Sequence, residues 1–443
     1  MNILVVGGGG REHAIAATLS KSPLTTRLIV APGNPGIETF AECYPIAADD
    51  IPGQCKLAQD IMADIVFIGP EIPLVLGLKD ELSKLGISAF GPSKKAAQLE
   101  GSKTFSRNFC KRHNIPQPEF KYCTDVDTAK KQIELLNGYC VVKADGLAAG
   151  KGVVVCDTVD QAIIASREML EKNKFGDAGK SILIEERING IEASVFAVSD
   201  GNNAVLIGTA QDHKRAYDND EGPNTGGMGA ISPAPALNQN LNKEIFNNII
   251  SPTINGMKLE GYPYEGILYA GVMITEKGPK VIEFNCRFGD PETQVVLPRL
   301  NTDLVSIVQK TIKKNLNNMT IDLIPQNAIT VVIASKGYPG EFEKGVLLPS
   351  LKNFNDRNEI SVFHSGTSKD KNENLISNGG RVLSITSIGA NVKDCRQKAY
   401  DVVEAINWEE GFYRKDIGKL WNYLISLKNS FINFSDLFAE NPE

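Results

Sequence analysis

The sequence predicts a multidomain chain of the α/β and α+β classes that opens with a doubly wound parallel sheet. Three observations support this prediction. The chain has 443 residues, enough for about two to four domains. Buried-type strands alternate with helical segments up to about residue 100, as they do in parallel sheets. From residue 139 the pattern changes to strands joined by glycine-rich loops, and a further segment of strands and a helix begins near residue 328.

The composition is typical of a soluble globular protein. The formal net charge of -6 gives no electrostatic reason to expect nucleic acid or an anionic membrane as a partner. Eight cysteines without a Cys-x-x-Cys pair and only four histidines argue against a zinc site and a disulfide framework. Because such cysteine usage fits a reducing compartment, we expect a cytoplasmic protein. We also expect no signal peptide and no membrane-spanning segment.

The N-terminal pattern is a strand at residues 2–6, a glycine turn at residues 7–10 and a helix that begins near residue 11. A helix that follows such a turn can bind an anion at its N-terminus. Dinucleotide binding is the alternative, but Glu12 stands where the third glycine of Gly-x-Gly-x-x-Gly belongs. The second strand, at residues 27–30, also ends without an acid for a ribose hydroxyl, so the sequence disfavours NAD.

Further strands at residues 64–68 and 87–90 continue the parallel sheet. Ligands of doubly wound sheets bind at the carboxyl ends of the strands. We therefore expect the loops at residues 8–10, 32–34 and 70–71 to lie close together.

A second glycine-rich loop, residues 144–152, joins strands at residues 140–143 and 153–156. It is not a Walker A loop, because Gly152 replaces the Ser or Thr and a strand follows instead of a helix. A glycine loop with lysines on either side can close over a triphosphate as a lid, with backbone N–H groups as donors. An ordinary flexible hairpin is the alternative interpretation.

Acidic and polar residues follow on the next predicted strands. The strand at residues 181–188 contains the acids Glu185 and Glu186, and Glu192 begins another strand. Acids in these places can accept hydrogen bonds from an adenine amino group and ribose hydroxyls, or they are only solvated charges. We interpret His213 as structural, because no Ser/His/Asp or Cys/His arrangement accompanies it.

Residues 281–285 predict a strand on which Glu283 and Asn285 share one face, because alternate residues of a strand point to the same side. A carboxylate and an amide oxygen two residues apart are hard donors that suit Mg²⁺. Arg287 lies on the same face and can bind a phosphate or a carboxylate. The alternative is a half-buried strand with a solvated polar face.

The C-terminal region predicts strands at residues 328–334, 361–364 and 381–386 and a helix from about 391 to 406. The tail from about residue 420 has apolar residues at helical spacing, and we interpret it as a packing helix without chemistry.

Three features thus occur in order: a lysine-flanked glycine loop, a strand that ends in acids and a Glu-x-Asn strand. Together they favour a nucleoside-triphosphate site that is neither a P-loop nor a kinase site. No side-chain nucleophile is evident in the sequence, which favours chemistry by positioning and charge stabilisation.

Motifs along most of the chain match one family. They are residues 8–13 (GGGREH), 31–34 (APGN), 69–71 (GPE), 98–103 (QLEGSK), 143–152 (KADGLAAGKG), 211–215 (QDHKR), 222–229 (GPNTGGMG), 283–292 (EFNCRFGDPE) and 414–418 (RKDIG). Through them the chain resembles the phosphoribosylamine–glycine ligase (glycinamide ribonucleotide synthetase) family of the ATP-grasp superfamily. QDHKR, GPNTGGMG and FNCRFGDPE are the motifs most specific to this family.

The resemblance implies a fold with three domains and a tail. The domains are an N-terminal substrate-binding α/β domain at residues 1–100, a two-lobed ATP-grasp domain at residues 101–327 with its glycine-rich lid lobe at about 121–190, and a C-terminal α+β domain at residues 328–420. A tail helix follows at residues 421–443.

The resemblance also implies a reaction. ATP phosphorylates the carboxylate of glycine, and the amine of 5-phosphoribosylamine attacks the resulting glycyl phosphate. The products are glycinamide ribonucleotide, ADP and phosphate, in de novo purine biosynthesis. The implied cofactors are ATP, as a substrate, and Mg²⁺ or Mn²⁺. The implied partners are small molecules only, and we expect a monomer or a weak homodimer.

The resemblance assigns roles to single residues. By this resemblance Glu283 and Asn285 bind the metal, and Lys103, Lys143 and Lys151 bind the ATP phosphates. Glu185, Glu186 and Glu192 bind adenine and ribose. The catalytic groups of the glycine and phosphoribosyl pocket are Asp212, Lys214, Arg287 and Asp290, with Asn224 beside them. The phosphoribosyl group is placed with the help of Gly8, Gly9, Gly10 and Glu12.

The chain departs from the family pattern in two places. Residues 7–10 read GGGG where the family often has GNGG, so any side-chain contact from that asparagine is missing. The strand at residues 269–274 carries no carboxylate, whereas many ATP-grasp enzymes have a second metal ligand there. A second metal would therefore depend on Glu283, phosphates and water. We expect none of the fused later activities of some eukaryotic relatives.

Other functions stay open at this point. An ATP-grasp carboxylase that activates bicarbonate would turn over ATP without glycine. A nucleotide-binding regulator would bind ATP without releasing phosphate, although Glu283, Asn285, Lys143 and Arg287 are all present to support turnover. An NAD-dependent enzyme is disfavoured by the missing acid after the second strand.

Overall fold

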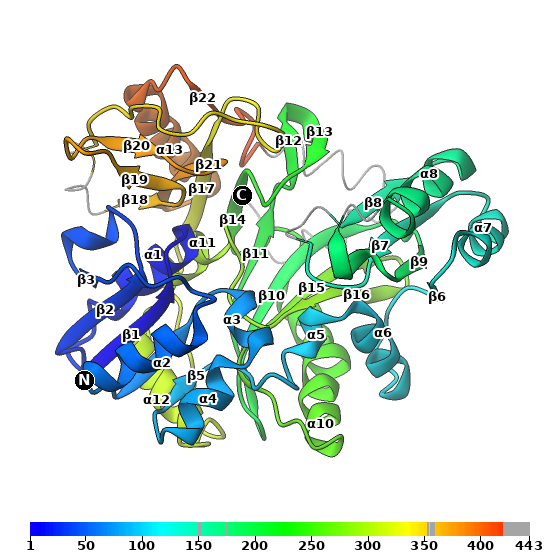
Figure 1. Ribbon diagram of the computed structural model, residues 1–443, viewed down its shortest axis with the longest axis horizontal. Coiled ribbons are helices and arrows are strands. Elements are labelled where there is room, and N and C mark those ends of the chain that lie inside the picture. The colour runs from blue at the N-terminus through cyan, green and yellow to red at the C-terminus, as the bar shows by residue number, and fades with distance from the viewer. Residues whose placement is uncertain (149–151, 173–174, 352–353, 355–358, 420–443) are drawn as a thin grey trace.

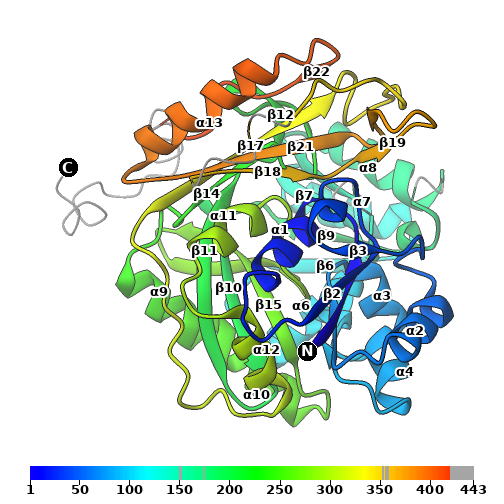
Figure 2. The same ribbon diagram turned by 90° about the vertical axis from the view of Figure 1, so that its left-hand side faces the viewer.

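The computed structural model describes residues 1–148, 152–172, 175–351, 354 and 359–419. Figures 1 and 2 show a parallel-sheet region at the N-terminus, a small outlying lobe and one large sheet through the middle of the molecule. Within the described ranges, no helix has both the length and the apolar character needed to cross a membrane.

The N-terminal region is a five-stranded parallel sheet in the order β3-β2-β1-β4-β5, which confirms the doubly wound prediction. Its strands are β1 (Asn2–Gly7), β2 (Arg27–Pro32), β3 (Glu42–Cys43), β4 (Ile65–Ile68) and β5 (Ala89–Phe90). Its helices are α1 (Gly10–Leu19), η1 (Ile37–Thr39), α2 (Ile51–Asp60), α3 (Glu71–Leu76) and α4 (Leu78–Lys84). The central strand β1 is apolar and buried along most of its length, as is usual for a parallel strand covered on both faces.

The loops at the carboxyl edge of this sheet meet as predicted. The backbone N–H of Gly33 donates to the carbonyl of Gly7 at 3.1 Å, and the N–H of Gly69 donates to the carbonyl of Val6 at 3.1 Å. These bonds bring the loops after β1, β2 and β4 to one place.

Two helices, α5 (Gln98–Gly101) and α6 (Lys103–Arg112), lead from the parallel sheet to the small lobe. The small lobe has an antiparallel sheet in the order β6-β9-β7-β8. Its elements are β6 (Phe120–Cys123), α7 (Val126–Leu135), β7 (Cys140–Ala144), β8 (Val153–Cys156), α8 (Val159–Leu170), η2 (Gly176–Gly179) and β9 (Ile182–Glu186). β7 and β8 pair with Lys143 opposite Val153, so the predicted strands around the glycine-rich loop are confirmed.

The large sheet has nine antiparallel strands in the order β16-β15-β10-β11-β14-β17-β21-β18, with β22 beside β17. They are β10 (Ile191–Asp200), β11 (Ala204–Asp212), β14 (Gly229–Ser232), β15 (Glu265–Thr275), β16 (Gly278–Asn285), β17 (Asn327–Ser335), β18 (Ile360–His364), β21 (Arg381–Gly389) and β22 (Gly411–Phe412).

Two small hairpins and several helices border this sheet. The hairpins are β12 (Arg215–Tyr217) with η3 (Asp218–Asp220) and β13 (Glu221–Asn224), and β19 (Thr367–Lys369) with β20 (Leu375–Ser377). The helices are α9 (Gln239–Ile245), the π-helix η4 (Phe246–Ile250), α10 (Ser251–Leu259), α11 (Thr293–Val296), η5 (Leu297–Arg299), α12 (Leu304–Ile312) and α13 (Val392–Ile406). Figure 2 shows α13 lying along the C-terminal strands.

The large sheet has two features that the sequence did not predict. β17 pairs with β14, so the C-terminal strands extend the central sheet. β16 begins at Gly278 rather than at residue 281, and a register shift leaves Ile282 as an extra residue opposite β15. The predicted tail helix, residues 421–443, lies outside the described residues.

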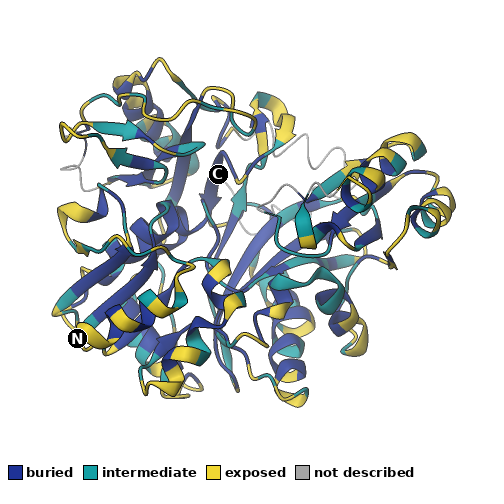
Figure 3. Ribbon diagram, viewed as in Figure 1, coloured by how far each residue is buried: buried dark blue, intermediate teal, exposed yellow. Residues whose placement is uncertain are grey.

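A shared hydrophobic core fixes the parallel sheet against the central sheet. Ile3 and Val5 of β1 belong to the same core as Phe196 of β10 and Val305 of α12. Figure 3 shows that the strands are mostly buried, whereas the outer helices carry exposed faces. The carboxyl edge of the parallel sheet is therefore held beside the central strands.

Two buried histidines join α1 to β18. The Nδ1 atom of His13 accepts a hydrogen bond from the backbone N–H of His364 at 2.9 Å, and the ring centroids are 5.7 Å apart. Burial and the neighbouring His364 lower the pKa of His13 to about 3. Burial lowers the pKa of His364 to about 4. Both rings are therefore neutral at neutral pH.

These histidines should make stability depend on pH. Between pH 6 and pH 4 the unfolded chain binds protons at His13 that the native protein excludes, so the free energy of unfolding falls as the pH falls. We expect His13 to contribute a slope of about 1.4 kcal/mol per pH unit in this range. The variant His13→Asn keeps an acceptor and should flatten the slope measured by urea unfolding. An equal slope in the variant and the parent would contradict the assignment.

Candidate functional site

The carboxyl end of β16 presents Glu283 and Asn285 beside β15. Gly271 is the cross-strand partner of Glu283, and Tyr269 is the partner of Asn285. A Cβ atom on Gly271 would lie 2.9 Å from Glu283 Cγ, so a glycine is needed there to leave room for the acid. The Glu283 side chain is 38% exposed, and one of its oxygens lies 3.5 Å from Lys214 Nζ.

The charges around Glu283 favour its ionised form. Burial raises the pKa of Glu283, but the lysines Lys214, Lys143 and Lys103 outweigh burial and lower it. An ionised carboxylate and the amide oxygen of Asn285 are donors that Mg²⁺ accepts together with phosphates and water. Among the residues that the structure describes, no group of three or more His, Cys, Asp or Glu side chains is arranged to hold a metal. Glu283 and Asn285 would offer two ligands to a magnesium ion, and phosphates and water would complete its coordination.

A buried ion-pair cluster lies behind this strand. Lys143 Nζ of β7 lies 2.8 Å from Glu185 Oε2 of β9 and donates to the carbonyl of Ile282 at 3.1 Å. Arg107 of α6 donates to both oxygens of Glu185, at 2.7 and 3.0 Å. Arg107 also donates to the carbonyl of Ile282 at 2.6 Å. The cluster therefore joins α6, the small lobe and the register shift of β16.

Arg107 was not singled out from the sequence. Its signal is helical spacing, because Lys103 and Arg107 are four residues apart and so lie on the same face of α6. Burial raises the pKa of Glu185, but Arg107 and Lys143 outweigh burial and hold it at about 2. Both oxygens of the predicted adenosine ligand Glu185 are thus engaged by cations of the protein itself.

Lys103 lies beside the start of the glycine-rich loop. Its Nζ donates to the carbonyl of Gly146 at 3.0 Å, and its backbone N–H donates to the carbonyl of Asp145 at 2.9 Å. Burial and the charge of Lys143 lower the pKa of Lys103. The predicted phosphate ligand Lys151 lies outside the described residues.

The other predicted adenosine residues lie at two separate places. Glu186, at the end of β9, accepts from the backbone N–H of Glu119 at 3.3 Å and lies 3.5 Å from Lys280 Nζ. Glu192 of β10 forms a direct ion pair with Lys214. The structure therefore places Glu192 on the side of Glu283, across Lys214.

Lys214 lies among the acids Glu192, Asp212 and Glu283. Burial lowers its pKa, but Glu192, Asp212 and Glu283 outweigh burial and raise it well above the ordinary value. Burial, opposed by Lys214 but assisted by the acids Glu292 and Glu192, raises the pKa of Asp212 well above its ordinary value. The QDHKR motif thus brings one cation and one acid to the Glu283 strand.

Arg287 joins the central sheet to the N-terminal region. Its guanidinium lies 3.2 Å from Glu71 Oε2 and 2.8 Å from Glu100 Oε1. Burial raises the pKa of Glu71, but Arg287 and Arg11 outweigh burial and hold it at about 2. The predicted anion-binding arginine is therefore fixed by acids from α3 and α5, neither of which had been given a role from the sequence.

The glycine turn lies next to this arginine cluster. The N–H of Gly9 donates to Glu12 Oε2 at 2.8 Å, and Arg11 Nε lies 2.5 Å from Glu12 Oε1. A Cβ atom on Gly8 would lie 2.3 Å from the carbonyl oxygen of Gly33, so only glycine fits there. Gly10 begins α1 and is buried. The turn is thus a fixed part of the wall opposite β16.

The remaining predicted pocket residues lie on the loops that follow β13 and β16. Asp290 Oδ2 lies 3.2 Å from Arg381 of β21, and Asp290 Oδ1 accepts from Gln294 at 2.8 Å. Asn224 ends β13, and no hydrogen bond joins its side chain to another residue in the described part of the chain. Arg381 also donates to the carbonyl of Gly226 at 2.6 Å, so it links the two loops.

The interpretation of His213 as a structural residue stays a prediction. Its backbone pairs with Gly229 and Met228, and its buried Nδ1 atom has no hydrogen-bond partner among the described residues. Burial and the charge of Arg414 lower its pKa to about 4. The ring is therefore a neutral group on the inner side of the QDHKR strand.

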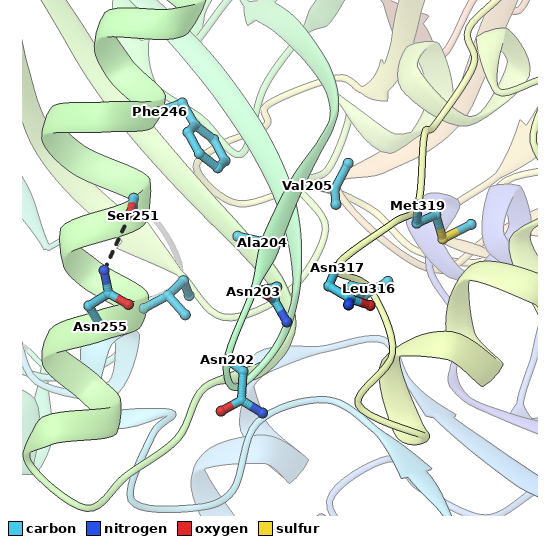
Figure 4. A pocket seen from close by; sticks show the side chains of 11 residues that line it. Asn202, Asn203, Ala204, Val205, Phe246, Ser251, Asn255, Leu316, Asn317 and Met319 are labelled. Carbon is cyan, nitrogen blue, oxygen red and sulfur yellow. Dashed lines mark hydrogen bonds between the residues drawn. The ribbon is translucent and has the colours of Figure 1, made fainter.

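A surface pocket of ≈ 240 Å³ lies elsewhere, between the β10–β11 turn, α10 and the chain after α12. Figure 4 shows Asn202, Asn203, Asn255 and Asn317 around it, with Phe246 at one side. None of the predicted site residues lines it. This pocket has no part in the chemistry described here.

Comparisons with known proteins agree along most of the chain. Profiles of phosphoribosylglycinamide synthetase match as an N domain at residues 1–100, an ATP-grasp (A) domain at residues 101–293 and a C domain at residues 328–420. The phosphoribosylamine–glycine ligase of Caulobacter vibrioides is 47% identical over 420 residues, which cover 94% of this chain and 98% of that protein. That of Yersinia pestis is 46% identical over 421 residues, with the same coverage of 94% and 98%.

Solved structures support the same relationship. A phosphoribosylamine–glycine ligase from Thermotoga maritima superposes with a TM-score of 0.81 at 30% identity and covers 94% of this chain and 100% of its own. The biotin carboxylase domain of 2-oxoglutarate carboxylase from Hydrogenobacter thermophilus has a TM-score of 0.72 at 15% identity, covers 98% of this chain and 99% of its own, and shares the fold alone. The fold and the site define the ATP-grasp class. Within that class, the chain belongs to the phosphoribosylamine–glycine ligase family.

We expect Arg107→Met to destabilise the protein because it leaves the Glu185 carboxylate buried with one cation fewer. Breaking a buried pair in this way costs about 3–5 kcal/mol. A matched control is Arg112→Met on the same helix, whose side chain is 49% exposed and pairs with Glu260. An exposed pair contributes at most about 1 kcal/mol. Thermal and urea unfolding of both variants measure the difference, and equal losses would contradict the importance of burial.

Proposed function

We propose that this ligase joins glycine to 5-phosphoribosylamine at the site around Glu283, with conversion of ATP to ADP and phosphate. The product is glycinamide ribonucleotide, an early compound of de novo purine biosynthesis. The observation that carries the residue assignment is the setting of Glu283, whose pKa is lowered by lysines from three different elements. Such a setting suits a site that gathers phosphates and a metal around one carboxylate.

The reaction needs an activated carboxylate, because a free carboxylate is a poor electrophile. We propose that the γ-phosphoryl group of ATP passes to glycine to form glycyl phosphate, which the amine of 5-phosphoribosylamine then attacks. Lys103 and Lys143 offset the negative charge that collects during phosphoryl transfer. Glu283 and Asn285 would hold Mg²⁺ or Mn²⁺, which supplies further charge neutralisation between the phosphates.

We assign the adenosine side of the site to Glu185, Glu186 and Glu192. Glu185 contributes there mainly by fixing Lys143, since both of its oxygens are engaged. Glu186 has a half-buried side chain at the end of β9 and can still accept from the nucleotide. Lys151 would contribute from the glycine-rich loop.

We assign the acceptor side, the pocket for glycine and 5-phosphoribosylamine, to residues at the ends of β11 and β13 and on the loops before β12 and after β16. Asp212, Lys214 and Asn224 come from the QDHKR and GPNTGGMG motifs, and Arg287 and Asp290 follow β16. The opposite wall is the glycine turn with Gly8, Gly9, Gly10 and Glu12, where the start of α1 favours an anion such as the ribose phosphate. We expect a cytoplasmic enzyme that acts as a monomer or a weak homodimer.

Phosphate release from ATP tests this function. The assay contains Mg²⁺, glycine and freshly made phosphoribosylamine, and each component is omitted in turn. We expect turnover only with all components, and a product with the mass of glycinamide ribonucleotide. Turnover with bicarbonate in place of glycine would keep the phosphoryl chemistry and overturn the substrate.

Glu283→Ala should reduce turnover more than about 100-fold even at saturating Mg²⁺, because it removes the charged metal ligand. The binding of Mn²⁺ in the presence of a non-hydrolysable ATP analogue should weaken in parallel. Glu276→Ala is the matched control, since this exposed acid lies in the turn at the other end of β16. Activity of Glu283→Ala close to that of the control would remove the metal assignment.

A further inference from the structure

The C-terminal RKDIG motif has no part in the proposed chemistry, yet it contains a fully buried arginine. The side chain of Arg414 is 0% exposed. Its Nε and Nη2 atoms each donate to Asp416 at 2.8 Å, and its Nη1 atom donates to Asp220 at 2.6 Å and to the carbonyl of Arg215 at 3.2 Å. Apart from its bonds to Asp416, which lies in the same segment, the hydrogen bonds of this arginine end on residues 215–224. We call these residues the β12–β13 hairpin.

Two more hydrogen bonds join the same partners. Asp416 accepts from the backbone N–H of Asn219 at 2.8 Å, and Asp218 accepts from the backbone N–H of Lys415 at 2.7 Å. The hairpin is thus bonded from β12 and from its turn to a segment almost 200 residues further along the chain. Figure 1 shows the hairpin projecting beside β22, just before this segment.

The segment itself is fixed to α13. The Tyr400 hydroxyl donates to the carbonyl of Arg414 at 2.6 Å and accepts from the N–H of Ile417 at 3.1 Å. Arg396 donates to the carbonyl of Lys415 at 2.5 Å. The RKDIG segment that binds the hairpin is therefore itself bound to the 15-residue helix α13.

Among the described residues, β12 and β13 form a two-stranded sheet of their own. Outside the bonds to the RKDIG segment, the Tyr217 ring also contacts Phe412 of β22, with centroids 6.1 Å apart. An isolated hairpin is only marginally stable in water. Its two ends nevertheless carry residues of the proposed acceptor side, because Lys214 precedes β12 and Asn224 ends β13. The N–H of Thr225 donates to the carbonyl of Lys214 at 2.8 Å, which couples the two ends.

We propose that Arg414 is a positioning residue of the acceptor pocket: by fixing the β12–β13 hairpin it keeps Lys214 and Asn224 in place for glycine and phosphoribosylamine. This inference rests on the proposed function. The bonds of Arg414 end on the hairpin and on Asp416, so it acts on the pocket by holding the hairpin. None of these bonds reaches Lys103 or Lys143 of the ATP side, and the link to that side is indirect, through the ion pair of Lys214 with Glu192.

The test uses two variants of the full-length enzyme. Arg414→Lys keeps the charge but loses the planar fork that bonds Asp416 and Asp220 together. Asp220→Asn is the gentler change, since this side chain is 54% exposed and can be altered without burying an unpaired group. The matched control is Arg299→Lys, a second buried arginine that bonds Ser232 and the carbonyls of residues 324 and 326, away from the hairpin.

The readouts are kcat, the KM values for glycine and phosphoribosylamine, the Kd of a non-hydrolysable ATP analogue and amide hydrogen exchange of residues 215–224. We expect Arg414→Lys to lower kcat/KM for both acceptor-side substrates about tenfold or more, with a much smaller change in the nucleotide Kd. Asp220→Asn should show a smaller loss of the same kind. Exchange of the hairpin amides should rise in both variants and stay unchanged in Arg299→Lys.

Three results would overturn the proposal. The first is faster hairpin exchange without a change in kcat/KM. The second is an equal loss toward ATP and toward the acceptor-side substrates, and the third is the same kinetic profile in Arg299→Lys. Lys214→Met and Asn224→Ala separate this failure from that of the proposed function. If neither changes the KM of glycine or phosphoribosylamine, the acceptor pocket itself is misplaced.

Discussion

The structure of the site depends on one buried carboxylate. Glu185 is 2% exposed and is held between Arg107 and Lys143, and these two cations also bind the carbonyl of Ile282. A charge removed from water in this way is tolerated only when its partners and hydrogen bonds are complete. The three segments that carry Arg107, Glu185 and Ile282 are therefore mutually dependent. The position of Lys143, and with it the start of the glycine-rich loop, is set by a group that has no free oxygen left for a ligand.

The same buried cations hold the edge of the central sheet. β16 is an edge strand in the described part of the chain, so the carbonyls on its outer side are available to side chains. Arg107 and Lys143 both donate to the carbonyl of Ile282, the extra residue of β16, and Arg107 also donates to that of Val281 at 3.1 Å. Ile282 directly precedes Glu283. Lys143 also helps to lower the pKa of Glu283, so the buried ion pair and the Glu283 carboxylate share one cation.

What could be predicted from the sequence is what depends on local periodicity and on short motifs. The parallel order of the first domain follows from alternating elements, and the meeting of its loops follows from that order. The common face of Glu283 and Asn285 follows from strand geometry. The partners of Arg107, Glu71 and Arg381 could not be found in this way, because they lie 78 or more residues away in the sequence. The pairing of β17 with β14 could not be predicted either, because the sequence of an apolar strand does not indicate which strand it pairs with.

The two acids that bind Arg287 differ in the direction of their pKa shifts. Arg287 is bonded to both Glu71 and Glu100, yet their pKa values move in opposite directions. Burial raises the pKa of both acids, and for Glu71 the charges of Arg287 and Arg11 prevail and hold it at about 2. For Glu100 burial prevails, with Glu71 adding to it, and its pKa is raised despite Arg287. When the environments of two neighbouring acids shift their pKa values in opposite directions, one acid stays ionised and the other is protonated more easily. Burial lowers the pKa of Arg287, but both acids raise it, Glu100 more than Glu71. Glu100 also accepts from the N–H of Cys286 at 2.7 Å and so anchors the loop after β16.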